Sequence, residues 1–428
     1  MDLLLAFIIT LSLITLVSLK FRITPFFTLV GGAILFGLMA GMTLDATLVD
    51  VVSGLGKVFS AFGIIIFCGA VIAALLQEQH QTGEIVSDVR RVVKHPPTLA
   101  GFSGYLLAVP ITCCVTAYVM LNPILDCLAK DKTKRNLLLY LAAVGSIISY
   151  ALIFPTPVVI PLFNAFAADT SALVYDAIAI PLSLVVLGVA ILFYRFASPK
   201  AFGTGDAPES CPAGASLPLP QAGYAGIHWR AWAPFIAIIV AIPVSFFLLG
   251  LSHVGIMNFI MLVGAVTAIA LAAPAVRTTG MTKGAKHAGL IIFDICGAGA
   301  LGYVIVHSGF TEGALQQMTL LIPVILIPFL FAALIETAQG SRVVTAVITA
   351  EVLAGSVVTS AIHPIPLILL ISAGSCFISF VTDPYFWLVQ RTTGDGIGTV
   401  VKNYTLPVAL AGVVILIAAL ALEFFVFR

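Results

Sequence analysis

Charged residues are scarce in this sequence: only 9% of its 428 residues are Asp, Glu, Lys or Arg, and 61% are hydrophobic. A soluble domain does not bury so large an apolar fraction, whereas a protein with several membrane spans exposes much of it to lipid. The formal net charge of +1 gives no electrostatic basis for binding nucleic acid. Composition therefore predicts a multi-pass protein whose main partner is the lipid bilayer.

The sequence also lacks the short motifs of common catalytic and metal sites. It has no GxxxxGK[ST] phosphate loop, no GxSxG turn and no HExxH motif. Its seven cysteines have neither CxxC nor Cys/His metal spacing, and most lie in apolar runs as small core residues. We therefore expect no ATP-driven step within this chain, no enzymatic activity, no cofactor and no metal. Two alternatives come from other classes of protein. One is an intramembrane enzyme, which would need a convergent nucleophile and base. The other is a channel, which would need rings of charge.

Apolar segments long enough to span a bilayer begin near the N-terminus, where a second segment follows at once. We therefore predict a first transmembrane helix there and not a cleaved signal peptide. Such segments lie at about 3–19, 25–43, 58–77, 137–167, 173–194, 232–252, 255–273 and 288–306. The only long polar stretch, 196–230, is rich in Gly, Pro and Ala and is predicted to be a flexible cytoplasmic linker. It separates a first transmembrane repeat at 1–195 from a second at 231–428.

The interrupted segment 99–128 has basic residues on both of its flanks. These are Arg90, Arg91 and Lys94 before it and Lys130, Lys132, Lys134 and Arg135 after it. By the positive-inside rule both flanks face the cytoplasm. Two spans across a core of about 30 Å do not fit in so few residues, so the segment is predicted to be a re-entrant hairpin.

The second half repeats the features of the first at an offset of about 228 residues. Cys68-Gly69-Ala70 recurs as Cys296-Gly297-Ala298, 99–128 falls on 327–356, and Pro155-Thr156-Pro157 falls on Asp383-Pro384-Tyr385. The second hairpin has no basic flanks, and the expected loop at 274–287 is basic where its counterpart at 44–57 is not. We therefore predict an all-α polytopic membrane protein with two inverted repeats of about five transmembrane helices, each containing a re-entrant hairpin and a broken helix. Both termini would then lie outside.

The most informative stretch is 334–355, LIETAQGSRVVTAVITAEVLAG, in which a Gln-Gly-Ser break at 339–341 lies between charged residues. Broken backbone and ionisable groups at membrane depth are costly, and they usually line a substrate or ion path. A surface loop between two ordinary helices is the alternative.

Further breaks fall at 112–116, 154–157 and 382–384, and half-helix N-termini there would suit an anionic substrate. The predicted substrate-binding residues are Thr112, Thr116, Tyr150, Thr156, Gln339, Gly340, Ser341, Arg342 and Thr382. Other polar residues near the breaks are Asn122, Thr337, Thr345 and Ser379.

Asp383 and Glu336 are the predicted ion-coupling residues. Asp383 lies in apolar surroundings at a helix joint, which suits a carboxyl group that binds and releases a proton. It also suits an N-cap for the half-helix that begins at Pro384. Arg342 has two possible partners, Glu336 or a substrate carboxylate.

Three motifs carry a family resemblance: Ala338-Gln339-Gly340-Ser341, SYALIFPTPVVIP at 149–161 and SFVTDPYFW at 379–387. They resemble, in that order, the AQGS signature, the THALVPPTPGP segment and the SHVNDSGFW segment of the gluconate permease (GntP) family of proton-coupled symporters. ICGAGALGYVIVHSG at 295–309 resembles its glycine-rich segment. The resemblance implies a symporter in the cytoplasmic (inner) membrane, with the inverted-repeat fold of the wider ion-transporter superfamily and a homodimeric assembly.

The sequence departs from that family's pattern at charged positions. Tyr150 and Phe380 replace family histidines, Cys114 replaces an aspartate, and Glu336 replaces a basic residue. The expected function is therefore secondary active symport of a small organic anion such as gluconate or a related sugar or hydroxy acid, with a proton as the coupling ion. The alternative is a sodium-coupled carboxylate or amino-acid transporter that takes a substrate such as D-serine.

Overall fold

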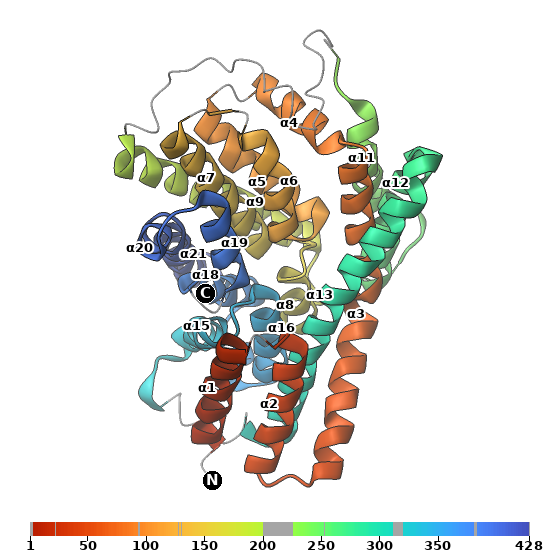
Figure 1. The fold of residues 1–428 in the computed structure, drawn as a ribbon. Helices are drawn as coiled ribbons and strands as arrows, with labels where there is room; N and C mark the ends of the chain where they lie inside the picture. The colour runs from red at the N-terminus through yellow and green to blue at the C-terminus, as the bar shows by residue number, and fades with distance from the viewer. Residues whose placement is uncertain are drawn as a thin grey trace.

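The computed structural model describes residues 3–21, 23–92, 95–126, 128–129, 131–199, 226–251, 253–310, 320–380 and 383–427. Within these ranges the regular structure is entirely helical (Figure 1). Helices satisfy their own backbone hydrogen bonds, which is the requirement for chain segments that lie in lipid.

The first half contains nine helices in its described residues. They are α1 (Leu3–Phe21), α2 (Pro25–Met39), α3 (Leu44–Glu78), α4 (Gln81–Val92), α5 (Pro96–Ile111), α6 (Cys114–Asp126), α7 (Lys132–Leu152), α8 (Val159–Phe166) and α9 (Ala172–Ala197). The predicted linker, 196–230, lies mostly outside the described residues, and α9 and α11 end and begin at its two edges.

The second half follows a similar order of elements. It contains α11 (Trp229–Pro243), the π-helix η1 (Val244–Leu248), α12 (His253–Leu271), α13 (Pro274–His307), the 3₁₀ turn η2 (Val324–Leu326), α15 (Ile327–Gln339), α16 (Arg342–Leu353), α17 (Val357–Ala361), α18 (Pro364–Phe377), α19 (Pro384–Thr393), α20 (Ile397–Val400), the π-helix η3 (Val401–Thr405) and α21 (Leu406–Phe425).

Four helical segments in the described residues are long and apolar enough to cross a membrane: Lys132–Leu152, Ala172–Ala197, Pro274–His307 and Ile397–Phe425. Helix α3 adds a fifth if its two parts, Leu44–Ser60 and Phe62–Glu78, which meet at 50°, are taken as one span. Shorter apolar helices include most of α1, α2, α11, α12, α15 and α18. The prediction of an all-helical multi-pass membrane protein is confirmed.

The long helices α3 and α13 correct one prediction, because 44–57 and 274–287 are helical and not loops. The side chain of Thr43 caps α3 by accepting a hydrogen bond from the Ala46 N–H at 3.2 Å, and α13 begins at Pro274. Both are favourable ways to start a helix. The two helices pack closely: a Cβ built on Gly54 would lie 2.5 Å from the Gly299 carbonyl oxygen. Small residues permit this approach, as in many membrane helix pairs.

The breaks predicted in the two hairpin segments are present. Thr112 follows the last residue of α5 and has a left-handed φ of 54°, and Gly340 follows the last residue of α15 with a φ of 61°. In each case the next helix, α6 or α16, packs against the one before it. The broken helices are present too: α7 stops at Leu152 and α8 starts at Val159, while α18 stops at Phe377 and α19 starts at Pro384. Pro155 and Pro157 lack a backbone donor, which explains why α7 stops before them, whereas Pro384 suits the first position of α19.

Candidate functional site

A buried ion pair joins the second hairpin to the second broken helix. Arg342 is the first residue of α16, and its guanidinium Nη1 lies 3.4 Å from Asp383 Oδ2. Asp383 is the N-cap of α19, and its other carboxylate oxygen accepts a hydrogen bond from the Tyr385 N–H at 2.8 Å. The two residues are only 5% and 2% exposed. The break at each helix therefore serves to bring opposite charges together inside the protein.

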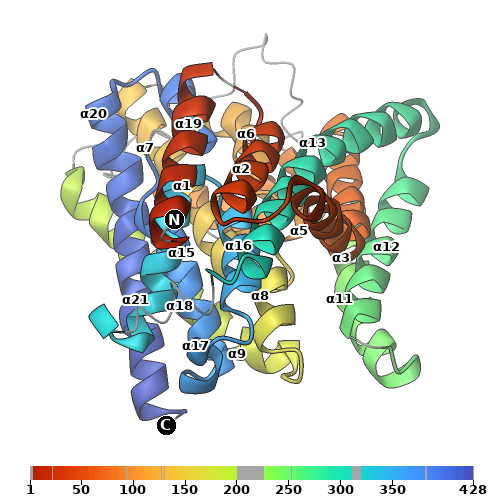
Figure 2. The same cartoon turned by 90° about the horizontal axis from the view of Figure 1, so that it is seen from below.

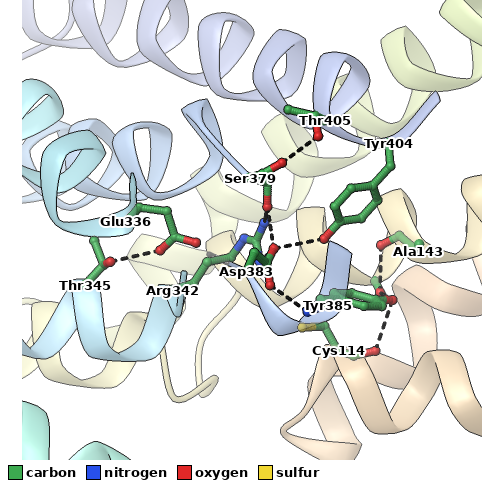
Figure 3. A network of polar contacts seen from close by, with 11 residues as sticks. Cys114, Ala143, Glu336, Arg342, Thr345, Ser379, Asp383, Tyr385, Tyr404 and Thr405 are labelled. Atoms are coloured by element: carbon green, nitrogen blue, oxygen red, sulfur yellow. Dashed lines mark hydrogen bonds and ion pairs between the residues drawn. The ribbon is translucent and has the colours of Figure 1, made fainter. Parts of the chain in front are cut away.

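Two hydroxyl groups contact this ion pair, and a third hydroxyl bonds the backbone of Ser379 (Figure 3). Ser379 Oγ accepts a hydrogen bond from Arg342 and donates one to Asp383 Oδ2 at 2.5 Å. Tyr404 donates to the same carboxylate oxygen at 3.1 Å, and Thr405 donates to the Ser379 carbonyl at 2.6 Å. Tyr404 and Thr405 belong to the π-helix η3, an irregular turn of a kind that often occurs at functional sites. The network therefore combines a cation, a carboxylate and hydroxyl groups, which are suitable for binding a hydroxylated acid.

Glu336 lies beside this network and has a different environment. Its side chain is fully buried, and Oε2 accepts a hydrogen bond from Thr345 at 2.9 Å. Its second oxygen, Oε1, has no hydrogen-bond partner among the described residues, and the same is true of Arg342 Nε. The sequence suggested Glu336 or a substrate carboxylate as the partner of Arg342. Among the described residues the ion-pair partner of Arg342 is Asp383 and not Glu336.

Tyr385 connects this network to the first half of the chain. Its hydroxyl lies 2.9 Å from Ser146 Oγ in α7 and donates to the Cys114 carbonyl at 3.4 Å. Its ring also meets that of Tyr118 edge-on, with centroids 5.4 Å apart. The start of α6, at the tip of the first hairpin, is thus next to the start of α19 (Figure 3).

Three of the four predicted residues of the first half are threonines whose hydroxyl groups form hydrogen bonds elsewhere. Thr112 Oγ1 donates to the Ile111 carbonyl at 2.7 Å, and Thr116 Oγ1 lies 2.9 Å from His287 Nε2 in α13. Thr156 Oγ1 accepts from the Val159 N–H at 3.4 Å and so helps to start α8. Tyr150 is buried near the end of α7. The hydrogen bonds of these three threonines therefore do not reach the Arg342–Asp383 pair.

The predicted residues of the second hairpin tip have backbone roles. Gly340 ends α15 in a left-handed conformation that glycine adopts at no steric cost, and Ser341 is the N-cap of α16 without a side-chain cap bond. The chain can therefore reverse and place Arg342 at the first position of the next helix. The structure describes Gln339 only as the last residue of α15, and Thr382 lies outside the described residues.

The sequence-based prediction missed Tyr385, Tyr404 and Thr405. A signal for the last two is present, because the polar run Lys402-Asn403-Tyr404-Thr405 interrupts an otherwise apolar C-terminal segment. Tyr385 had no such signal, since a tyrosine within an aromatic run is more often a packing residue.

Comparison with known families places this site in context. The model of the GntP family of permeases matches residues 1–206 and 232–425, which is nearly the whole chain. The chain belongs to the GntP family. As a member of this permease family it is a secondary transporter in a membrane and not an enzyme.

Curated GntP relatives are similar over most of their length. An uncharacterized permease from Haemophilus influenzae is 24% identical over 421 residues, covering 90% of this chain and 85% of the relative. A high-affinity gluconate transporter from Escherichia coli is 23% identical over 440 residues, covering 96% and 97%. The Gnt-II system L-idonate transporter of the same organism is 23% identical over 455 residues, covering 96% and 97%.

Solved transporters share the fold. The Alcanivorax borkumensis YdaH transporter matches with a TM-score of 0.64 and 18% identity, covering 89% of each chain. MtrF from Neisseria gonorrhoeae, an antimetabolite efflux pump, matches with a TM-score of 0.58 and 16% identity, covering 89% of this chain and 85% of its own. The fold of this GntP-family member is therefore a transporter fold.

Proposed function

We propose that this protein is a symporter, coupled to protons, that imports a small organic anion such as gluconate or a related sugar acid across the cytoplasmic membrane. The observation that carries the proposal is the buried Arg342 guanidinium at the first position of a half-helix. A cation there, together with the free N–H groups of a helix start, attracts a carboxylate. The gluconate and L-idonate transporters among its relatives support this substrate class.

Substrate binding would use the network around Arg342. A substrate carboxylate would compete with Asp383 for the guanidinium, whose Nε has no partner among the described residues. The hydroxyls of Ser379 and Tyr404, now held on Asp383, would become available to hydroxyl groups of a sugar acid. Selection between an acid with hydroxyl groups and one without them would then come from whether these buried groups find partners.

For ion coupling we propose Glu336 and not Asp383. Neutralising Asp383 would leave Arg342 as a buried charge without a partner, which costs about 3–5 kcal/mol. Glu336 carries no such partner: one of its oxygens accepts from Thr345 and the other has none among the described residues. A carboxyl group in that position is compatible with carrying a proton, because a proton on Oε1 removes the cost of a buried negative charge.

We also infer that the halves are inverted repeats and that α5–α6 and α15–α16 are re-entrant hairpins. Two observations support this inference. The left-handed residues Thr112 and Gly340, which end the first arms, are 228 residues apart. Asp176 accepts from the Phe154 N–H at the first broken helix, and Tyr404, 228 residues after Asp176, donates to Asp383 at the second. The homodimer stays a prediction from family resemblance.

Uptake into proteoliposomes tests this function. Purified protein is reconstituted, and uptake of radiolabelled gluconate, L-idonate, a dicarboxylate and D-serine is measured under an imposed proton or sodium gradient. The proposal expects uphill uptake of a sugar acid that requires an inward proton gradient. Accumulation driven by sodium, or of D-serine alone, would establish the alternative transporter instead, and uptake that neither gradient drives would contradict coupling.

A further inference from the structure

A cavity of about 220 Å³ lies apart from the Arg342–Asp383 network. It is formed by α3, α8 and α16, and its lining includes Lys57, Phe62, Asn164, Val347 and Glu351. It has room for about seven water molecules, which is enough for a small organic anion. Two of the helices that form it, α8 and α16, are the segments that begin at breaks of the chain.

An ion pair lies in the cavity. Lys57 Nζ is 2.7 Å from Glu351 Oε2, and the two side chains are 58% and 20% exposed. The ammonium group also lies 5.8 Å from the centroid of the Tyr303 ring. Glu351 packs against α13: a Cβ atom built on Gly302 would lie 3.2 Å from the Cβ atom of Glu351. The stem of Glu351 therefore packs against α13, while the lysine is at the solvent side.

The cavity and the binding network both use residues of α16. Helix α16 begins with Arg342, and Glu351 follows nine residues later, which corresponds to about 13.5 Å along the helix axis. Val347 and Ala350 line the cavity from the same helix. A ligand beside Glu351 would therefore lie about 13.5 Å farther along α16 than Arg342 and, two and a half turns on, near the opposite face of the helix.

We propose that this cavity is a loading site for the transported anion, in which the Lys57 ammonium exchanges Glu351 for a carboxylate of the substrate. The inference rests on the proposed function, because the anion that the cavity would hold is the proposed substrate. A surface ion pair contributes little to stability, so its exchange for a substrate carboxylate costs little. A cation at the mouth of a partly enclosed cavity also raises the local concentration of anions and their rate of arrival.

Opposite effects of the two partners test the loading site. At low ionic strength, Lys57→Gln is expected to lower kcat/KM for gluconate uptake by roughly three- to tenfold and to weaken its dependence on salt. Glu351→Gln removes the competitor of the substrate and is expected to raise kcat/KM. A merely structural bridge would make both variants worse to a similar degree, and that result would overturn the proposal.

The chain offers a matched control pair. Lys283 Nζ and Glu78 Oε1 are 2.6 Å apart with side-chain exposures of 61% and 22%, they link α13 to α3, and neither lines the cavity. Lys283→Gln and Glu78→Gln should leave the uptake rate and its salt dependence unchanged. Equal losses in Lys283→Gln and Lys57→Gln would also contradict a specific role for Lys57.

A second readout does not depend on transport and so separates failure of the loading site from failure of the proposed function. A cysteine is placed at Ala165, an exposed residue that lines the cavity. The rate at which this cysteine is labelled is measured with two reagents, the anionic sulfonatoethyl methanethiosulfonate and the neutral methyl methanethiosulfonate. Labelling of the parent chain, which lacks the added cysteine, is subtracted as background. Lys57→Gln is expected to lower the anionic-to-neutral rate ratio by about threefold or more, whereas Lys283→Gln should not. An unchanged ratio in Lys57→Gln would overturn the loading site whatever the transport assays show.

Discussion

At the scale of single residues, Arg342 and Asp383 depend on each other. Both are buried, and Ser379 and Tyr404 satisfy the carboxylate from other directions. A buried ion pair adds little net stability compared with apolar residues, yet the loss of one partner is strongly destabilising. Such a pair is suited to a site where a second carboxylate, that of a substrate, replaces the first.

The Asp383→Asn variant is expected to lose about 3–5 kcal/mol of stability, because Arg342 keeps its charge without a buried counter-charge. The cap itself should survive, since Asn is nearly as good an N-cap as Asp. Thermal unfolding in detergent measures the change, and the double variant Arg342→Gln with Asp383→Asn should lose less than the sum of the two single losses. If Asp383→Asn is as stable as the parent, the ion pair is unimportant, and if the variant also loses proton-driven uptake while it keeps substrate exchange, Asp383 is the proton carrier.

Sequence reasoning identified both members of this pair but not that they meet. The position of Asp383 before Pro384 suggested either a proton-binding group or an N-cap, and the N-cap is confirmed. Its pairing with Arg342 joins residues 41 positions apart on different helices, and no local pattern carries that information. The same is true of Tyr404, whose role depends on how η3 packs beside the break.

At the scale of elements, the tip of the first hairpin fits into a space provided by Gly69 of α3. Thr112 adopts a left-handed φ of 54°, which is uncommon for a residue other than glycine. A Cβ on Gly69 would lie 2.2 Å from Thr112 Oγ1. The hairpin tip therefore contacts α3 at a point where only glycine leaves enough room.

The Gly69→Ala variant is expected to lose about 1–3 kcal/mol of stability from this overlap. Adding Thr112→Gly should restore most of it, because the second change removes the side chain that clashes. The control is Gly56→Ala in the same helix, which has nothing within 4 Å and should be neutral or slightly stabilising. Thermal unfolding compares the three, and equal behaviour of Gly56→Ala and Gly69→Ala would contradict the contact.

Asp88 of α4 joins the two halves outside the membrane spans. It accepts hydrogen bonds from the His228 N–H and the Trp232 indole at 2.9 and 3.0 Å, and its carboxylate also lies 2.9 Å from His228 Nδ1 and 3.7 Å from Arg91. Burial alone would raise the pKa of Asp88, but the hydrogen bonds from His228 and Trp232 outweigh burial and lower it. The fold therefore favours the ionised form.

Because the folded pKa of Asp88 is below its ordinary value, its stabilisation is fully present above about pH 4 and is lost as the pH falls through the lowered pKa. Asp88→Asn is expected to cost about 1.5–3 kcal/mol near neutral pH, where the hydrogen bonds involve a charged group. The difference in melting temperature between the variant and the parent should be constant down to about pH 4 and shrink below it. A difference that grows as the pH falls would contradict this sign.

Helix breaks could be predicted from the sequence near 112–116, 154–157, 339–341 and 382–384, because proline, glycine or polar residues interrupt apolar segments there. The lengths of α3 and α13 could not be predicted in the same way. Their first turns carry charged residues that look like a loop, but Thr43 and Pro274 start helices that continue beyond the apolar part.

At the scale of the whole molecule, ion pairs join residues that the inverted-repeat topology assigns to the same side. Lys132–Asp395 and Lys283–Glu78 fall on the predicted cytoplasmic side, and Lys57–Glu351 falls on the other. Figure 2 shows α19 and α20 at one end of the view, and α17 and the C-terminus at the opposite end. This arrangement supports the topology that the distribution of basic residues predicted.

Labelling of single cysteines in intact cells tests that topology. Arg91→Cys and Lys132→Cys should react only after the membrane is permeabilised, because both flanks of the first hairpin are placed in the cytoplasm. Asp169→Cys and Ser360→Cys should react with an impermeant reagent in intact cells. Labelling of Arg91→Cys and Lys132→Cys from opposite sides would mean that the first hairpin crosses the membrane, and the inverted-repeat model would fail.

The measurement that tests the central claim most directly compares uphill uptake with exchange for Glu336→Gln. Gln keeps the volume of the side chain and an oxygen for the Thr345 hydroxyl, but it cannot bind and release a proton. In the same proteoliposomes, we expect Glu336→Gln to lose proton-driven accumulation of gluconate while it keeps counterflow exchange within about twofold of the parent. Accumulation at the parent's level, with an unchanged dependence on the proton gradient, would show that Glu336 does not couple transport to protons.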